Sequence, residues 1–349
     1  MSMVFMFVGC EAEEVVEEPV DEEPVDEEPV DEEPIDEEPI EVIISSAPGE
    51  GGVEEEALNN FKDYLEEMSD GRFDVYLYMG GTLGPDEEIS QQLQLGEVQI
   101  QYAGVSELEM FLGAGNWPFN IPFLFDDRQE AQELLTQELI PQFNEQLPGA
   151  ADVKLLGGVI RTPRKLTATR PIEHPEDVRG LDIRLPQISE WLIMWEDILG
   201  GNAVAMGGGE VFSALQTGMI EAQENPISFI YANSLYEVTE YIHHTDHMLA
   251  PRMVYVSTEW LDTLTEQEQE WVFEAGDRAF TEQFERETVI EAELMEELEE
   301  LGVTFVDIDY DLWQGYVVDD IEEQYKDIFE EDIWEEYIAP RLEMIREAQ

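Results

Sequence analysis

The sequence predicts an α/β protein of about two domains, and three observations support this class. The chain has 349 residues, which is enough for two domains of ordinary size. Hydrophobic residues make up 43% of the chain, so a packed core is expected even though the formal net charge is −68. From residue 41 onward, strand-like and helix-like patterns alternate, which is typical of parallel or mixed sheets covered by helices.

The first folded unit has the order strand, helix, strand, helix, strand. Apolar residues at helical spacing predict its helices, and Gly71 and Gly96 mark their ends. The expected elements are strands at 42–44, 73–79 and 98–103 and helices at 53–68 and 87–95. Ligands of such folds bind at the C-terminal ends of strands, which here lie near Ser45, Gly80 and Gly104.

A second unit begins near Arg161 and continues the alternation. The pattern beyond Pro226 is mostly helical as far as Tyr241. The capping box Thr265-x-x-Glu268 opens a long helix that could reach Leu301. The other expected elements are strands at 164–169, 181–185, 220–223 and 253–257 and helices at 189–199 and 210–217.

The acidity of the chain excludes several partners. With 84 acidic against 16 basic residues, the protein lacks the basic surface that nucleic acids or anionic lipid headgroups require. Residues 11–41 hold 18 of the acids and no base, so residues 42–349 still carry a net charge of −50. Lysine is scarce, four residues against twelve arginines. Because salt screens such self-repulsion, the composition indicates a salt-adapted, halophilic protein.

The single cysteine, Cys10, follows the apolar run Met3–Gly9. A small residue before a cysteine behind an apolar run resembles the lipobox of a bacterial lipoprotein signal, so lipidation at Cys10 is expected. The run is shorter than usual, no basic residues precede it, and Phe7 stands where leucine is usual, which is consistent with a truncated signal at residues 1–10. The alternative is a buried cysteine in a frayed N-terminus. No apolar run is long enough to span a bilayer, so any membrane contact is expected through the lipid anchor alone.

Residues 11–41 form an acidic repeat with a proline at every fifth position from Pro19 to Pro39. Proline interrupts helices and sheet ladders, and the like charges repel, so an extended polyproline-like linker is expected. Behind a lipid-bearing cysteine it would serve as a tether. The alternative is a solvated acidic tail without a role.

Sequence motifs give no support for catalysis or for a cofactor. Phosphate-binding loops, dinucleotide fingerprints and the G-x-S-x-G nucleophile motif are absent from the sequence. On a helix, His243 and His247 would share one face and could ligate zinc, but the glutamate of H-E-x-x-H is missing. A capped, partly buried turn is the favoured interpretation of this segment, so neither a metal nor a cofactor is expected.

Six of the sixteen basic residues fall within 24 positions: Arg161, Arg164, Lys165, Arg170, Arg179 and Arg184. In so acidic a chain, this cluster can bind an anion, because a guanidinium matches a carboxylate with two parallel hydrogen bonds. The alternative is pairing with neighbours such as Glu176, Asp177 and Asp182. We favour that pairing for Arg161, Arg170 and Arg179, and anion binding for Arg164 and Arg184.

Several motifs resemble one known family. The run Arg170-Pro171-Ile172 and Pro175 to Pro186, the run Glu210 to Gly218, and Gln223-Glu224-Asn225-Pro226 are similar to signatures of the solute-binding proteins of TRAP (tripartite ATP-independent periplasmic) transporters. Ile121-Pro122-Phe123-Leu124-Phe125 and Thr245-x-His247 also fit that family. The resemblance covers roughly residues 42–310 in order.

The resemblance implies a two-lobed periplasmic-binding-protein fold with a long helix spanning the lobes. It assigns residues 42–161 and 251–290 to lobe I, and residues 162–250 and 291–349 to lobe II. It also implies a periplasmic or extracytoplasmic protein that captures a carboxylate-bearing molecule, of the sugar-acid or C4-dicarboxylate type. The protein would deliver this ligand to a TRAP permease with small and large membrane subunits. The aromatic-rich stretch after Asp309 is expected to form helices that pack on a lobe.

By the same resemblance, Arg184 matches the arginine that clamps the ligand carboxylate. Arg164 matches a second arginine near that carboxylate, and Asn225 a polar ligand of the same site. Gly104 and Gly208 fall where the family places specificity side chains, and Gly208 should leave room where an aromatic residue is common. Glu88 is a weaker candidate for contacting a hydroxyl.

Two other functions stay open. A sensory protein of the same fold could present its ligand to a membrane receptor, and gene neighbourhood would distinguish it from a transport protein. An enzyme acting on acidic sugars is disfavoured, because no plausible base lies near the arginine cluster in sequence.

Overall fold

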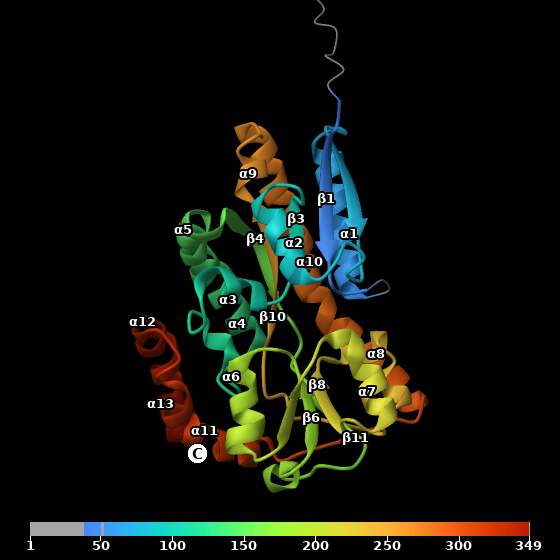
Figure 1. Ribbon diagram of the computed structural model, residues 1–349, viewed down its shortest axis with the longest axis vertical. Coiled ribbons are helices and arrows are strands. Elements are labelled where there is room, and N and C mark those ends of the chain that lie inside the picture. The colour runs from blue at the N-terminus through green and yellow to red at the C-terminus, as the bar shows by residue number, and fades with distance from the viewer. Residues whose placement is uncertain (1–37, 50–51, 349) are drawn as a thin grey trace, which may run out of the picture. The chain divides into compact units, whose positions relative to one another are not determined.

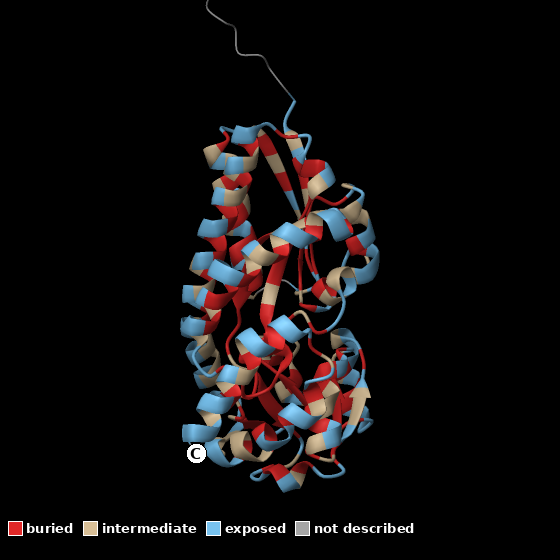
Figure 2. Ribbon diagram, turned by 90° about the vertical axis from the view of Figure 1, so that its left-hand side faces the viewer, coloured by how far each residue is buried: buried red, intermediate tan, exposed pale blue. Residues whose placement is uncertain are grey.

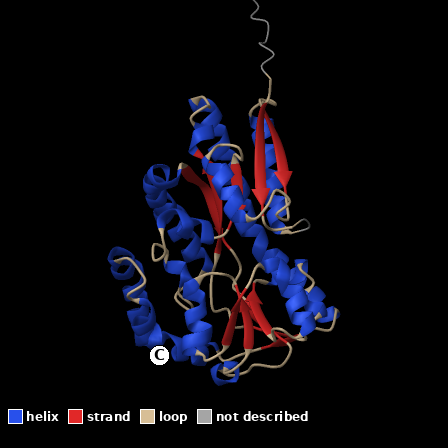
Figure 3. Cartoon of the chain, viewed as in Figure 1, coloured by secondary structure: helices blue, strands red, loops and turns tan. Residues whose placement is uncertain are grey.

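The computed structural model describes residues 38–49 and 52–348. Cys10 and linker residues 11–37 lie outside the described residues, so the signal and the tether stay predictions. Residues 39–349 form one compact unit that contains two sheets flanked by helices (Figures 1 and 3). The predicted α/β class is therefore confirmed.

The first sheet has the strand order β2-β1-β3-β10-β4. Strands β2 and β3 pair in parallel with β1, whereas β10 runs antiparallel to its neighbours β3 and β4. The strands are β1 (Ile40–Ser46), β2 (Phe73–Tyr78), β3 (Ile100–Ala103), β4 (Val153–Ile160) and β10 (Pro251–Ser257).

The second sheet has the order β11-β9-β5-β8-β6-β7. Strand β6 is parallel to β7 and β8, and β5 is antiparallel to β8 and β9. The strands are β5 (Lys165–Ala168), β6 (Asp182–Leu185), β7 (Asn202–Ala205), β8 (Ala222–Asn225), β9 (Tyr241–His243) and β11 (Thr304–Val306).

The helices cover both sheets and leave their outer faces to solvent, as Figure 2 shows by the pale blue sides of the helices around the red strands. They are α1 (Val53–Met68), α2 (Asp86–Gln94), α3 (Ser106–Leu112), α4 (Arg128–Leu134), α5 (Ile140–Ala151), α6 (Ser189–Leu192), α7 (Val211–Thr217), α8 (Ile227–Ala232), α9 (Thr258–Leu261), α10 (Glu266–Glu300), α11 (Tyr310–Tyr325), α12 (Glu331–Ile333) and α13 (Ala339–Ala348). The short 3₁₀ or π segments of the described residues are η1 (Pro118–Asn120), η2 (Leu135–Leu139), η3 (Pro175–Val178), η4 (Ile193–Ile198), η5 (Gly208–Glu210), η6 (Leu235–Glu237) and η7 (Trp334–Ile338).

The long helix α10 starts at the predicted capping box, where Thr265 Oγ1 accepts a hydrogen bond from the Glu268 N–H. It packs against α1 and β4 of the first sheet and against α8 beside the second sheet, so one helix connects both halves (Figure 1). The predicted helix with an end near Leu301 is confirmed.

Two short segments also connect the sheets and bring particular strand ends together. The chain leaves the first sheet at the end of β4 and enters the second at the start of β5, through residues 161–164. It returns from the end of β9 to the start of β10 through residues 244–250. The C-terminal ends of the parallel strands lie beside these crossing segments. In the first sheet Ala103, at the end of β3, pairs with Met253 near the start of β10, and in the second sheet Asn225, at the end of β8, pairs with Lys165 at the start of β5.

Strands β7 and β11 and helices α3 to α5 were not predicted, and local patterns failed at three further places. Residues 241–243 form strand β9 rather than the end of a helix, because β9 is held between β5 and β11. The predicted helix at 189–199 is α-helical only over α6 and continues as the π segment η4. Strand β4 was missed, since Gly157 and Gly158 weaken its apolar pattern.

None of the helices within the described residues combines the length and the apolar character needed to cross a bilayer.

Candidate ligand-binding site

Arg184 lies near the C-terminal end of β6, on the edge that faces the crossing segments. Its side chain is 4% exposed. The Nε and Nη2 atoms donate to the Met206 carbonyl at 3.0 and 2.7 Å, which fixes the orientation of the guanidinium. No carboxylate of the described chain forms an ion pair with Arg184, and its Nη1 donates no hydrogen bond to these residues. Burial, opposed by the charge of Glu224, lowers the pKa of Arg184 to about 10, so the group stays cationic at neutral pH.

Arg164, the residue directly before β5, has an acidic partner. Its Nε and Nη2 atoms bind the two carboxylate oxygens of Glu224, and Nη2 also donates to the Asn225 Oδ1 at 3.0 Å. In the antiparallel pairing of β5 with β8, Leu166 lies opposite Glu224. This register brings Arg164, two positions before Leu166, close to the Glu224 carboxylate. Burial alone would raise the pKa of the Glu224 carboxyl, but Arg164 and His247 lower it to about 2.

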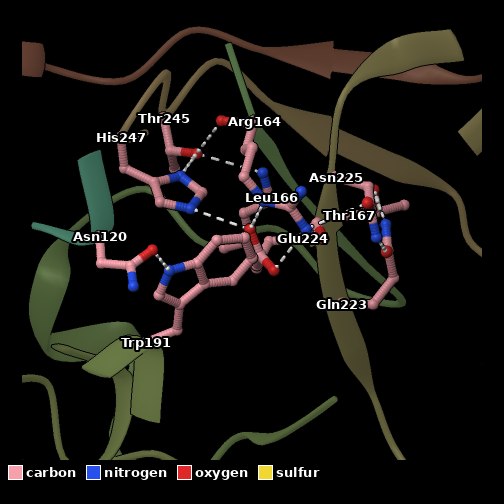
Figure 4. Close-up of polar contacts among 10 residues, drawn as sticks. All are labelled: Asn120, Arg164, Leu166, Thr167, Trp191, Gln223, Glu224, Asn225, Thr245 and His247. Atoms are coloured by element: carbon pink, nitrogen blue, oxygen red, sulfur yellow. Dashed lines mark hydrogen bonds and ion pairs between the residues drawn. The ribbon is translucent and has the colours of Figure 1, made fainter. Parts of the chain in front are cut away.

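His247 completes this buried group, as Figure 4 shows. Its Nε2 lies 3.1 Å from Glu224 Oε2, and its Nδ1 is hydrogen-bonded to Thr245 Oγ1 at 2.9 Å. The Arg164 guanidinium stacks over the Trp191 ring, and the Trp191 indole N–H donates to Asn120 Oδ1 at 3.0 Å. Arg164 is therefore held in place on several sides, while its Nη1 donates to none of the described residues.

Asn225 ends β8 beside these groups and is 4% exposed. Its side-chain carbonyl accepts from Arg164, and its amide donates to Gln223 Oε1 at 2.7 Å. The structure thus brings the sequence-predicted residues Arg164 and Asn225 into direct contact. A ligand role for Arg164, Arg184 and Asn225 stays a prediction.

The remaining basic residues of the cluster have other surroundings. Arg161 is buried and pairs with Glu54 at 3.6 Å, rather than with an acid near it in sequence. Arg170 donates to the Asp177 carbonyl at 3.0 Å, and Arg179 is exposed. Lys165 pairs with Asp246 and Glu291.

The three lower-ranked candidates lie on different elements. Gly104 follows β3, at the same edge of the first sheet as Arg252. Glu88 is an exposed residue of α2. Gly208 begins η5, and a Cβ there would lie 3.3 Å from Phe229 Cζ. The room expected at Gly208 is therefore occupied by an aromatic ring supplied by α8.

Residues 243–247 form neither a helix that could hold zinc nor a partly buried turn. His243 lies in a strand and His247 in a crossing segment, so the two do not share a helical face. Both are fully buried, and His243 Nε2 accepts the Ile172 N–H at 2.8 Å. Within the described residues, no group of three or more histidine, cysteine or acidic side chains could hold a metal ion.

Glu224, Trp191 and the Met206 carbonyl, which contact Arg164 or Arg184, were not named as candidates from the sequence, and neither was Arg252 at the edge of the first sheet. Glu224 lies within the Gln223–Pro226 motif, so a signal for it was present in the sequence. Arg252 lies far from the basic cluster in the chain, and only the pairing of β10 with β3 reveals its position.

Comparison with known proteins decides the family. The sequence pattern of bacterial extracellular solute-binding protein family 7 (DctP) matches residues 44–332. The chain belongs to this family. Members of family 7 are solute-binding proteins, and the predicted TRAP type and two-lobed fold are confirmed.

Individual family 7 proteins show the extent of the similarity. A solute-binding protein of Roseobacter denitrificans is 29% identical over 75% of this chain and 80% of its own length. The sialic acid-binding periplasmic protein SiaP of Vibrio cholerae is 26% identical over 74% of this chain and 81% of its own. Among solved structures, a TRAP periplasmic solute-binding protein of Roseobacter denitrificans with bound L-galactonate has a TM-score of 0.76 at 26% identity, covering 88% of this chain and 98% of the other. One from Anaerococcus prevotii with bound D-glucuronate has a TM-score of 0.78 at 25% identity, covering 88% and 97%.

Proposed function

We propose that the protein captures a carboxylate-bearing small molecule, of the sugar-acid or C4-dicarboxylate type, between the facing edges of its two sheets. It then delivers the ligand to a TRAP permease made of small and large membrane subunits. Relatives described as binding L-galactonate, D-glucuronate and C4-dicarboxylates support this ligand class. The grouping of β1–β4 and β10 in one sheet and of β5–β9 and β11 in the other supports two lobes.

The observation that supports the proposal most strongly is that Arg184 is buried and has no carboxylate partner among the described residues. A buried guanidinium without a carboxylate partner is costly, and a ligand carboxylate would supply that partner. The Met206 carbonyl holds Nε–H and one N–H of Nη2, so the two N–H groups of Nη1 and the second N–H of Nη2 are left for the ligand. Arg164, oriented by Glu224 and Trp191, offers its own Nη1, and Asn225 lies against it.

A thermal-shift screen of organic acids, followed by titration calorimetry, tests the proposal. A ligand present at 100 times its Kd adds about 2.7 kcal/mol to the free energy of unfolding, which gives a clear rise in Tm. We expect one or more sugar acids or dicarboxylates to bind with one site per chain. Stabilisation by neutral or cationic compounds alone, with none by acids, would contradict the proposal.

Residues 40 and 41, expected in the linker, belong to strand β1. We further propose that Cys10 carries a lipid and that the residues between it and β1, 11–39, act as a tether. The Gly9-Cys10 step and the proline repeat support this. Incorporation of a labelled fatty acid should be lost in Cys10→Ser, and equal labelling of both proteins would exclude this anchor.

A further inference from the structure

Arg252 is a second arginine without an acidic partner at the edge of the first sheet. It lies at the start of β10, where Met253 pairs with Ala103, the last residue of β3. Its Nε is buried and has no hydrogen-bond partner. Across residues 38–49 and 52–348, no carboxylate lies within ion-pair distance of its guanidinium.

Three polar atoms surround Gly104 at this position. A Cβ at residue 104 would lie 3.6 Å from Arg252 Nη1, 3.7 Å from Ser106 Oγ and 3.8 Å from Glu107 Oε2. Because Gly104 has no side chain, the guanidinium, the hydroxyl and the carboxyl meet beside bare backbone. Ser106 donates to Glu107 at 3.0 Å, which leaves Arg252 as the unused donor.

Glu107 is a weak counter-ion for Arg252 although it lies close. The residue is 5% exposed, and burial together with the charge of Asp86 raises the pKa of its carboxyl to about 7. Near neutral pH a large part of this carboxyl is protonated, so it can donate a hydrogen bond to a ligand oxygen.

Arg252 and Arg184 flank a row of arginines at the sheet crossings. Burial and the charges of Arg252 and Arg164 lower the pKa of Arg161 to about 10, as expected for neighbouring cations. Arg161 has Glu54 as its partner and Arg164 has Glu224, so the inner two are compensated. Arg184 on the second sheet and Arg252 on the first form no ion pair with a carboxylate of the described residues, although burial raises the pKa of Asp86 and the charge of Arg252 opposes that rise.

We propose that Arg252 determines specificity by binding a second acidic group of the ligand, which makes the ligand a hydroxylated dicarboxylate. One carboxylate pairs with Arg184 and the other with Arg252, while Ser106 and Glu107 contact hydroxyl groups between or beside them. This inference rests on the proposed function and narrows its ligand class.

The test compares acids that differ only at the far end, using the full chain at pH 7. Galactarate and glucarate carry a second carboxylate where galactonate and gluconate carry a hydroxymethyl group. By calorimetry, the wild type should bind the better diacid at least about tenfold more tightly than its matched monoacid.

Arg252→Gln should reduce this ratio of monoacid to diacid Kd to about one. Arg252→Lys should leave an intermediate ratio, because a point charge replaces the planar fork. The exposed Arg179→Gln should keep the wild-type ratio, and circular dichroism checks that each variant is folded.

Equal binding of monoacid and diacid by the wild type, or a preference that survives Arg252→Gln, would overturn the inference. In both cases binding of an acid leaves the proposed function intact. If no acid of a broad panel binds the wild type, the proposed function fails as well.

Discussion

Arg164 and Glu224 form an ion pair that is almost fully removed from solvent, with exposed side-chain fractions of 5% and 1%. Charges in such surroundings are tolerated only when their remaining donors and acceptors are satisfied. Here His247 and the Glu224 backbone carbonyl supply hydrogen bonds, and Trp191 covers the guanidinium face. The pair therefore fixes Arg164 beside the edge where Arg184 lies.

Removing one partner of this pair should be costly. Glu224→Gln leaves Arg164 buried without a counter-charge, and we expect a loss of about 3–5 kcal/mol in the free energy of unfolding at pH 7. Because the pKa of Glu224 is lowered from 4.5 to about 2, its contribution is present above pH 4.5 and is lost as the pH falls toward 2. The difference between wild type and variant, measured by urea denaturation, should shrink over that range.

The control is an ion pair at the surface, Arg341 with Glu130, whose glutamate is 54% exposed. Glu130→Gln should cost no more than about 1 kcal/mol. Equal losses for the two variants would show that burial of the Arg164 pair has no energetic consequence.

At the scale of elements, the close packing of α10 on β4 depends on two glycines. A Cβ at Gly157 would lie 2.8 Å from Phe280 Cδ2, and one at Gly276 would lie 2.9 Å from Leu156 Cγ. Each element thus has a glycine where the other presents a large apolar side chain. This explains a glycine inside a long helix, where it costs about 1 kcal/mol relative to alanine.

Gly276→Ala tests this packing. The gain in helix propensity is about 1 kcal/mol, but overpacking costs about 1–3 kcal/mol, so we expect a net loss of stability. In a Leu156→Ala background the obstructing side chain is gone, and there Gly276→Ala should be neutral or stabilising. Thermal denaturation of the four proteins gives the coupling energy. A loss of the same size in both backgrounds would rule out the Leu156 contact as its cause.

At the scale of the whole molecule, residues 42–349 carry a net charge of −50. The folded state gathers this charge into a compact volume, so self-repulsion favours unfolding when screening is weak. Part of this charge lies on the exposed face of α10, for example at Glu266, Glu270 and Glu274.

Stability should therefore rise with ionic strength. We expect the Tm to increase steeply from low salt to about 1 M, where the screening length falls to about 3 Å. The measurement is differential scanning calorimetry at fixed pH in a series of KCl concentrations. A Tm that stays flat across the series would refute salt adaptation of the folded part.

The sequence was sufficient for elements such as β1, α1 and α10, because their periodic patterns are local. Arg184 and Asn225 became site candidates through the family motifs that contain them, and their contact with a ligand stays a prediction. The sequence could not identify Glu224 as the partner of Arg164, because the two are sixty positions apart and meet only through the pairing of β5 with β8. Strand β9 and the position of Arg252 were missed for the same reason, since non-local strand pairing determines both.

The central claim is that Arg184 binds the carboxylate of the ligand, and titration calorimetry with the best acid from the screen tests it most directly. Arg184→Ala should weaken binding by about 2–5 kcal/mol, or roughly 30- to 4,000-fold, because the ligand anion then lacks its partner. Arg184→Lys should recover only part of this, and the exposed Arg179→Ala should stay within about 0.5 kcal/mol of wild type. Binding by folded Arg184→Ala as tight as that of the wild type would contradict the account.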